Sequence, residues 1–165
     1  MVGRKKLPRS LFVSAPPSAG VMARALPDLV LTFDAQAVLW NSYDRIDIDF
    51  SSAPDKAIIP EGKNTFTLRL GADYATHMPG LSLRAGVIYD HAAIPSTGLG
   101  PGLPDSTRID GALGVGYGRG HFKADLGYLL VYFLAADASS RREGPEGTYH
   151  TVAHLFGLTL RATWP

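Results

Sequence analysis

The chain has 165 residues and a formal net charge of +1, and it contains no cysteine. The length suits one domain, the near-neutral charge gives no indication of nucleic-acid binding, and the lack of cysteine excludes disulfides and thiolate metal sites. The 18 glycines and the 10% of aromatic residues are more typical of an all-β chain than of a helical one.

The first residues are basic, but we do not expect them to form an export signal. Arg4–Lys6 could open a signal peptide, but Pro8–Ser10 interrupt the apolar segment that must follow. We therefore expect residues 1–6 to be a disordered basic N-terminus. The longest apolar run, Gly127–Ala136, has about half the length that a membrane-spanning helix needs, so no such helix is expected.

Apolar and polar residues alternate along most of the chain, which is the period of a β-strand. No segment shows a convincing amphipathic helical pattern. In chain order, the expected strands are a weaker one at Arg9–Ala15, then Leu29–Trp40, Thr65–Ala75, Leu81–Asp90, Arg108–Gly118, His121–Phe133 and Tyr149–Trp164.

The two faces of these strands differ in a way that suits a membrane. One face is apolar and tends to end in an aromatic residue, whereas the other carries charges in mid-strand. If the apolar face contacts lipid and the charged face lines a lumen, both patterns are explained, and the aromatics mark the membrane interfaces. The expected interface aromatics are Tyr74, Tyr89, Tyr117, Tyr132 and Trp164. The expected lumen-facing charge ladder contains Asp34, Arg69, Asp73, Asp90, Asp110, Lys123 and Asp125.

The connections between the strands alternate in length. Thr76–Gly80 and Arg119–Gly120 are short, whereas Asn41–Asn64, Ala92–Thr107 and Asp137–Thr148 are long. Outer-membrane barrels have short periplasmic turns and long external loops. The sequence therefore predicts an all-β fold that forms part of an antiparallel transmembrane β-barrel.

Two motifs that could suggest a nucleotide-binding site or a metal site do not support either. The glycine-rich run Gly111–Phe122 (GALGVGYGRGHF) lacks the following helix that a nucleotide-binding loop requires, and we interpret it as a strand and its turn. His150 and His154 would lie about 13 Å apart on a strand, too far to share one metal ion. We expect no catalytic residues, no metal site and no cofactor.

Several motifs resemble those of one known family. In the order of the chain they are Leu26–Asp28 (LPD), Leu39–Asn41 (LWN) with Tyr43, Leu70–Tyr74 (LGADY), Leu83–Asp90 (LRAGVIYD), Ile94–Pro95, Leu103–Asp105 (LPD), the strand with GALGVGYG, and Gly147–Tyr149 (GTY). Together they resemble the C-terminal half of the FadL/TodX family of outer-membrane transporters for hydrophobic compounds. The resemblance extends from about residue 7 to the end and is most specific over Leu68–Tyr117.

The resemblance implies a fold, a function and a location. It implies a fourteen-stranded barrel in the outer membrane, plugged by an N-terminal hatch, through which long-chain fatty acids or aromatic hydrocarbons pass without covalent chemistry and leave sideways. We expect about seven strands in this chain, without the hatch, the gating residues and the signal peptide. An odd number of strands leaves two unpaired edges in lipid. We therefore expect a truncated or split gene product that needs the N-terminal half or a second copy to close.

The resemblance also points to candidate ligand-binding residues. Arg84 and Arg108 are the cations expected to hold a fatty-acid carboxylate, because they lie in adjacent strands that flank the long loop Ala92–Thr107. Ile94 and Leu99 of that loop are expected to contact an entering acyl chain. The expected partners are thus outer-membrane lipid and a hydrophobic small molecule, and not nucleic acid.

Two alternatives remain open from the sequence. The chain could be a soluble or peripheral β-rich module that binds a lipophilic ligand, or an inactive fragment of a barrel. Solubility without detergent would favour the soluble module over a part of a transmembrane barrel.

Overall fold

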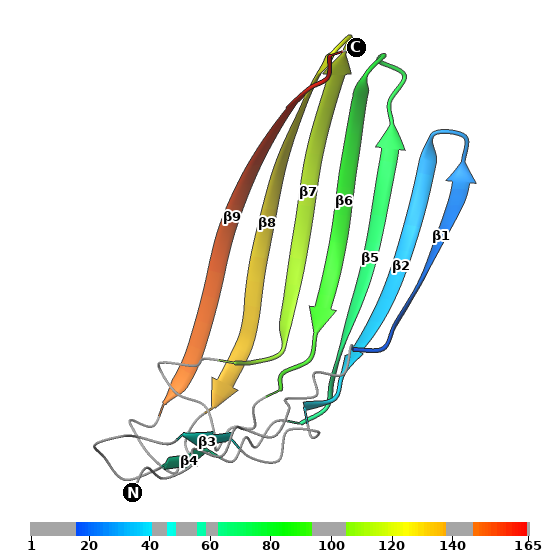
Figure 1. The fold of residues 1–165 in the computed structure, drawn as a ribbon. Coiled ribbons are helices and arrows are strands. Elements are labelled where there is room, and N and C mark those ends of the chain that lie inside the picture. Colours follow the sequence, from blue (N-terminus) through cyan, green and yellow to red (C-terminus); the bar gives the residue numbers. More distant parts are fainter. Residues whose placement is uncertain are drawn as a thin grey trace, which may run out of the picture.

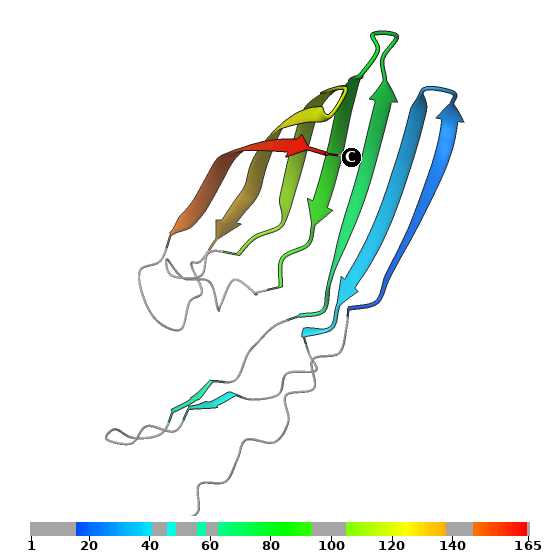
Figure 2. The same ribbon diagram turned by 45° about the horizontal axis from the view of Figure 1, so that its top comes forward.

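The computed structural model describes residues 16–40, 46–48, 56–58, 63–93, 105–137 and 147–164. Its main sheet has seven strands that neighbour one another in chain order, and every pair is antiparallel (Figures 1 and 2). These strands are β1 (Ser18–Leu26), β2 (Leu29–Val38), β5 (Thr65–Ala75), β6 (Leu81–Asp90), β7 (Arg108–Arg119), β8 (Phe122–Asp137) and β9 (Thr148–Ala162).

A second, small sheet lies in the connection between β2 and β5. It consists of β3 (Ile46–Ile48) and β4 (Lys56–Ile58), which pair with each other in antiparallel fashion. Within the described residues, no helix is long and apolar enough to cross a membrane.

Six of the expected strands are present with bounds close to those predicted, and the all-β meander is confirmed. The first strand of the sheet is different: it is β1, Ser18–Leu26, which the alternation did not reveal. The expected strand Arg9–Ala15 lies outside the described residues. The pattern of β1 is weak because small residues occupy its apolar face, whereas the large apolar side chain of Met22 shares the opposite face with Arg24.

The connections alternate in length as expected, and they separate the two ends of the sheet. Pro27–Asp28, Thr76–Gly80 and Gly120–His121 are short turns at one end, and the strand ends that the long connections join lie at the other end (Figure 1). Gly80 and Gly120 have φ angles of +85° and +59°, a backbone conformation that favours glycine in tight turns. We call these the short-turn end and the long-connection end.

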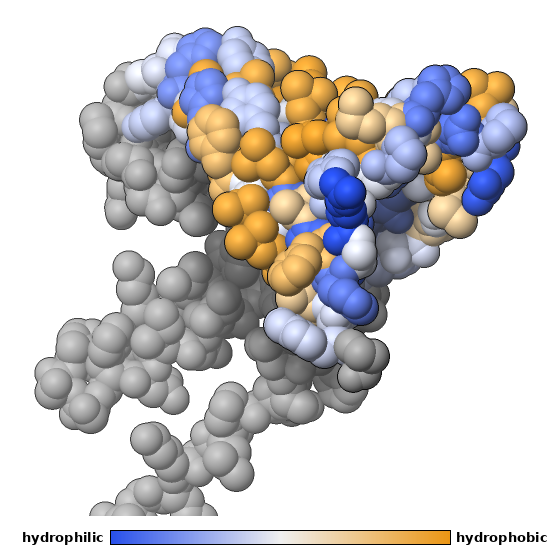
Figure 3. Space-filling view, turned by 90° about the horizontal axis from the view of Figure 1, so that it is seen from above, coloured by the Kyte–Doolittle hydropathy of each residue, from blue (hydrophilic) through white to orange (hydrophobic). Residues whose placement is uncertain are grey.

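The sheet is a single layer without a packed core in the described residues. Val131 is the one buried hydrophobic residue there, and large apolar side chains such as Leu113 (62%), Leu158 (66%) and Phe156 (77%) are exposed. They all lie on the same side of the sheet, which we call the apolar face; the opposite side is the polar face. Figure 3 shows hydrophobic side chains gathered over part of the molecular surface. The apolar face therefore needs a nonaqueous neighbour.

Candidate functional site

Among the residues that the structure describes, the polar face carries three clusters of ion pairs, the first of which joins β2 and β5. Asp34 and Arg69 are directly opposite each other in the register of these strands. Arg69 Nη1 lies 2.6 Å from Asp34 Oδ1, and Arg69 Nη2 donates to Gln36 Oε1 at 2.9 Å. Both partners of the ion pair are about 40% exposed, so solvent weakens its contribution to stability.

The second cluster is centred on Arg84 and joins three strands. Arg84 Nε donates to Asp73 Oδ2 of β5 at 2.8 Å, and Arg84 Nη1 donates to Asp125 Oδ1 of β8 at 2.8 Å. Lys123 Nζ also lies 3.7 Å from Asp125 Oδ1. Arg84 belongs to β6, so its guanidinium reaches Asp125 across the intervening strand β7.

Glycine in β7 makes this bridge possible. Gly116 is paired with Ser82 on one side and with Asp125 on the other. A Cβ atom at Gly116 would lie 2.5 Å from Asp125 Oδ1, 2.8 Å from Ser82 Oγ and 3.3 Å from Arg84 Nη2. Gly116, in the glycine-rich run, thus leaves the space through which Arg84 reaches across β7 to Asp125 of β8.

The third cluster surrounds Arg108 at the long-connection end. Arg108 Nη2 lies 2.6 Å from Asp90 Oδ2, and its Nε lies 3.6 Å from Asp110 Oδ2. Asp90 also accepts a hydrogen bond of 2.7 Å from Thr67 Oγ1. The guanidinium carbon is 5.7 Å from the centre of the Phe133 ring, which is within the range of a cation–π contact.

Asp110 is the most buried charged residue among those described. Its exposure is 4%, and Asp110 Oδ1 and Arg108 Nε have no hydrogen-bond partner in the described structure. This cluster has two carboxylates for one guanidinium, so its net charge is negative when all groups are ionised.

The structure separates the two arginines that the sequence placed beside the same loop. Arg108 does lie at the long-connection end, opposite Asp90. Arg84 is opposite Gly114, six residues further along β7, which corresponds to about 20 Å in an extended strand. They therefore belong to different clusters, and Arg84 does not flank the loop. Ile94 and Leu99 lie outside the described residues.

The expected aromatic residues lie near the two ends of the sheet. Tyr74, Tyr117 and Trp164 lie close to the short-turn end, and Tyr89 and Tyr132 close to the long-connection end. The register places Tyr89 opposite Ile109 and Ile109 opposite Tyr132, so these two tyrosines share a row on the apolar face.

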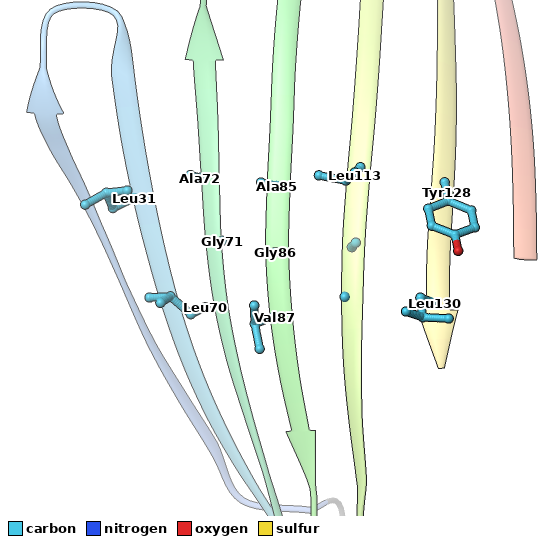
Figure 4. A pocket seen from close by; sticks show the side chains of 12 residues that line it. Leu31, Leu70, Gly71, Ala72, Ala85, Gly86, Val87, Leu113, Tyr128 and Leu130 are labelled. Atoms are coloured by element: carbon cyan, nitrogen blue, oxygen red, sulfur yellow. The ribbon is translucent and has the colours of Figure 1, made fainter. Parts of the chain in front are cut away.

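The apolar face also contains a depression of about 540 Å³ that the sequence analysis missed (Figure 4). Its floor is formed by small residues, including Ala72, Ala85 and Gly111, and larger side chains such as Leu70 and Leu113 surround it. The signal in the sequence was a set of small residues at apolar positions in neighbouring strands, but only the register shows that they lie side by side.

A polar pair lies beside this depression. Tyr128, which lines the depression, has its hydroxyl oxygen 2.8 Å from Nδ1 of His154 in β9, and its ring packs against Phe156 with 5.1 Å between centres. His154 thus lies on the apolar face, and its Nδ1 shares a hydrogen bond with Tyr128 of the neighbouring strand.

Comparisons with known proteins agree on one family. A sequence profile described as "Outer membrane protein transport protein (OMPP1/FadL/TodX)" matches residues 14–164. The structure is similar to the crystal structure of a Pseudomonas aeruginosa FadL homologue, with a TM-score of 0.77 and 22% sequence identity over 88% of this chain. The matched region is 34% of that homologue, so this chain spans about a third of its length. No curated protein sequence matches the chain. The structural likeness concerns the fold: an open antiparallel sheet equivalent to part of a FadL barrel.

Proposed function

Because the chain belongs to the OMPP1/FadL/TodX family of outer membrane transport proteins, we propose that it forms part of a barrel through which hydrophobic compounds cross the outer membrane. The expected substrates are long-chain fatty acids or aromatic hydrocarbons, and their passage is passive. No residue is assigned a catalytic role, and no cofactor is required for such transfer.

The division of the sheet into two faces is the observation that supports this proposal best. The apolar face exposes leucine, valine and phenylalanine along the length of the strands, whereas the ion pairs of the polar face are made within the sheet itself. A bilayer can cover the first face, and a water-containing lumen suits the second. The proposed partners are therefore outer-membrane lipid outside the barrel and a hydrophobic small molecule inside it.

The proposed route starts at the long-connection end. Of the two candidate arginines, Arg108 is the one that lies at that end. Its Nη2 is 2.6 Å from Asp90 Oδ2, so a fatty-acid carboxylate must compete with Asp90 for it. Arg84 has both of its carboxylate partners at 2.8 Å, so a fatty-acid carboxylate must displace an aspartate to reach it. The role of both arginines stays a prediction, as do the contacts of Ile94 and Leu99 with an acyl chain.

The soluble ligand-binding module is the weaker alternative. Burying apolar area from water is worth about 25 cal/mol per Å², so a water-soluble domain with this many exposed leucines would lose a large part of its hydrophobic stabilisation. The inactive barrel fragment has the same membrane-facing surface as a functional one, and only transport distinguishes the two.

The test combines membrane association with uptake. The full chain, directed to the outer membrane by an added signal peptide, should remain in the membrane fraction after carbonate washing and should partition into detergent. Cells that lack their own fatty-acid transporter should then take up a labelled long-chain fatty acid when the chain is present together with the rest of a barrel. Recovery of a soluble monomer without detergent would contradict the membrane proposal, and membrane insertion without uptake would indicate an inactive fragment.

A further inference from the structure

Tyr128 and His154 form a polar pair in the middle of the apolar face. On β7, Leu113 lies midway between Tyr117 and Ile109, which belong to the two rows that contain the interface tyrosines. Leu113 is directly opposite Tyr128, so Tyr128 lies in the row halfway between the two interfaces, and His154 lies one row nearer the long-connection end. Ionisable side chains at this depth in a membrane are rare and mark functional sites.

The hydrogen bond between the two residues leaves one donor of the pair unused. It joins the Tyr128 hydroxyl and Nδ1 of His154 at 2.8 Å. Neutral imidazole has one N–H and tyrosine has one O–H, so one hydrogen bond uses one of the two donors, whichever tautomer is present. Among the described residues, neither side chain makes a second hydrogen bond. The hydrocarbon core of a bilayer offers no acceptor, so the pair needs one from a bound molecule.

The unused donor lies at one end of the depression on the same face. Two neighbouring rows of the register line this depression, and they consist of Leu31, Ala72, Ala85, Leu113 and Tyr128 in one row and Leu70, Val87, Gly111 and Leu130 in the other. Tyr128 ends the first row of lining residues, and His154 continues the second row onto β9, directly opposite Leu130. Figure 4 shows the Tyr128 hydroxyl directed along β8 toward Leu130. The polar pair therefore closes the β8 end of the depression.

The shape of the depression suits a small molecule that lies across the strands. It extends from β2 to β8, a span of five neighbouring strands and thus of about 19 Å at the usual strand spacing. Its volume of about 540 Å³ is within the range of small-molecule pockets. Barrel strands are tilted from the membrane normal, so a depression that crosses them is also oblique to the surrounding lipid chains.

Bulk phospholipid and charged compounds both fit this site poorly. The oxygen atoms of a phospholipid lie in the interfacial regions outside the hydrocarbon core, whereas the polar pair lies about midway between the interface rows. None of the described lining residues is cationic, and a charged group is costly in the middle of a bilayer. The remaining class of ligand is apolar and carries an uncharged oxygen.

We propose that the depression, together with Tyr128 and His154, binds a long-chain compound that carries one uncharged oxygen, of which a long-chain alcohol is the simplest member. We call this the wall site. The hydrocarbon body lies over the small residues of the floor, and the oxygen accepts a hydrogen bond from the unused donor of the pair. The inference rests on the proposed function, because it presupposes that lipid covers the apolar face. It adds a site on the outer side of the barrel wall, separate from the lumen.

The test compares two compounds that differ only in the oxygen. The full chain is inserted into lipid nanodiscs, and the uptake of radiolabelled hexadecanol or hexadecane is measured in excess of nanodiscs without protein. We expect saturable binding of hexadecanol and about tenfold weaker binding of hexadecane, because the alkane cannot accept the hydrogen bond.

Variants of the chain separate the polar pair from the depression. The double variant Tyr128→Phe, His154→Leu removes both donors and should reduce hexadecanol binding to the level of hexadecane. Ala85→Leu fills the floor of the depression and should weaken binding of hexadecanol. Ala124→Leu is the matched control on the same face, since Ala124 lies opposite Tyr117 and outside the depression, and it should leave binding unchanged. Circular dichroism checks that each variant keeps its β-structure.

Equal binding of the two compounds by the inserted chain would overturn the proposal, as would undiminished hexadecanol binding by either the double variant or Ala85→Leu. Association of two chains in one nanodisc that is lost in Ala85→Leu would show that a second copy fills the depression, and would also overturn it. Failure of the chain to enter nanodiscs would instead contradict the proposed function, whereas insertion without selective binding contradicts the wall site alone.

Discussion

Arg84 shows how a single side chain connects several strands on the polar face. It belongs to β6, yet its two carboxylate partners come from β5 and β8, so it joins strands that are not neighbours. Charge-assisted hydrogen bonds with good geometry are stronger than neutral ones, although partial exposure weakens them. The bridge depends on Gly116, which leaves room for the guanidinium above β7.

Substitution of Gly116 by alanine should therefore destabilise the sheet. The new methyl group would overlap Asp125 Oδ1 and displace the Arg84 bridge, and overpacking of this kind costs about 1–3 kcal/mol. The urea midpoint of unfolding in detergent measures the effect. Gly111→Ala is the matched control on the same strand, because a Cβ there meets nothing within 4 Å. Equal midpoints for the two variants would contradict the importance of the bridge.

Arg108 allows a test of the predicted carboxylate contact. If it holds the headgroup of a fatty acid, Arg108→Gln should lower uptake of the acid about tenfold, the equivalent of one charge-assisted hydrogen bond of about 1.5 kcal/mol. Uptake of a neutral hydrocarbon of the same chain length should change little. Arg69→Gln, in a separate cluster of the polar face, serves as the control. An equal loss for both substrates would leave Arg108 with a structural role only.

Individual strands show why the alternation of residues was informative. Leu129 and Leu130 are consecutive in β8 but lie on opposite faces: Leu129 is opposite Ala112 on the polar face, and Leu130 is opposite Gly111 on the apolar face. A helix would not separate neighbouring residues in this way, whereas a strand must. The position of each leucine thus follows from its parity.

Lysine substitutions at these two positions should differ in effect. Leu130→Lys places a charge toward lipid, at a cost of about 2–4 kcal/mol near the middle of the bilayer, and it should reduce membrane insertion. Leu129→Lys directs the same charge toward the lumen, and insertion should persist. Carbonate extraction of membranes, followed by quantification of each variant, measures the difference. Equal extraction of both variants would contradict the assignment of the two faces.

The whole sheet has two ends with different connections, and this asymmetry predicts its orientation across the membrane. Short turns lie at one end, and the strand ends that the long connections join lie at the other (Figure 1). In outer-membrane barrels these ends face the periplasm and the exterior respectively. His121 lies in a short turn, and Gly147 lies at the end of a long connection.

Labelling from one side of the membrane tests this orientation. The chain has no cysteine, so His121→Cys and Gly147→Cys each introduce a unique thiol. A membrane-impermeant thiol reagent added to intact cells should label the variant at position 147 and not the one at 121. Permeabilising the outer membrane should then expose the second position. Labelling of both variants in intact cells would contradict a sheet that spans the membrane.

The chain's local pattern was sufficient for six of the seven strands of the main sheet, for their two faces and for the alternation of short and long connections. This is because each of these features depends on residues close together in sequence: the period of two sorts side chains between faces, and turn residues end the strands. The same pattern failed for β1, where Met22 and Arg24 share a face with small residues and the contrast between the faces is lost.

The contacts between side chains of different strands could be identified only from the tertiary structure. The register, and not the local pattern, decides that Arg84 meets Asp125 across Gly116, that Arg84 and Arg108 lie in separate clusters, and that Ala72, Ala85 and Gly111 form one depression. Alternation specifies which side chains of a strand share a face, whereas pairing between strands specifies which side chains of different strands meet.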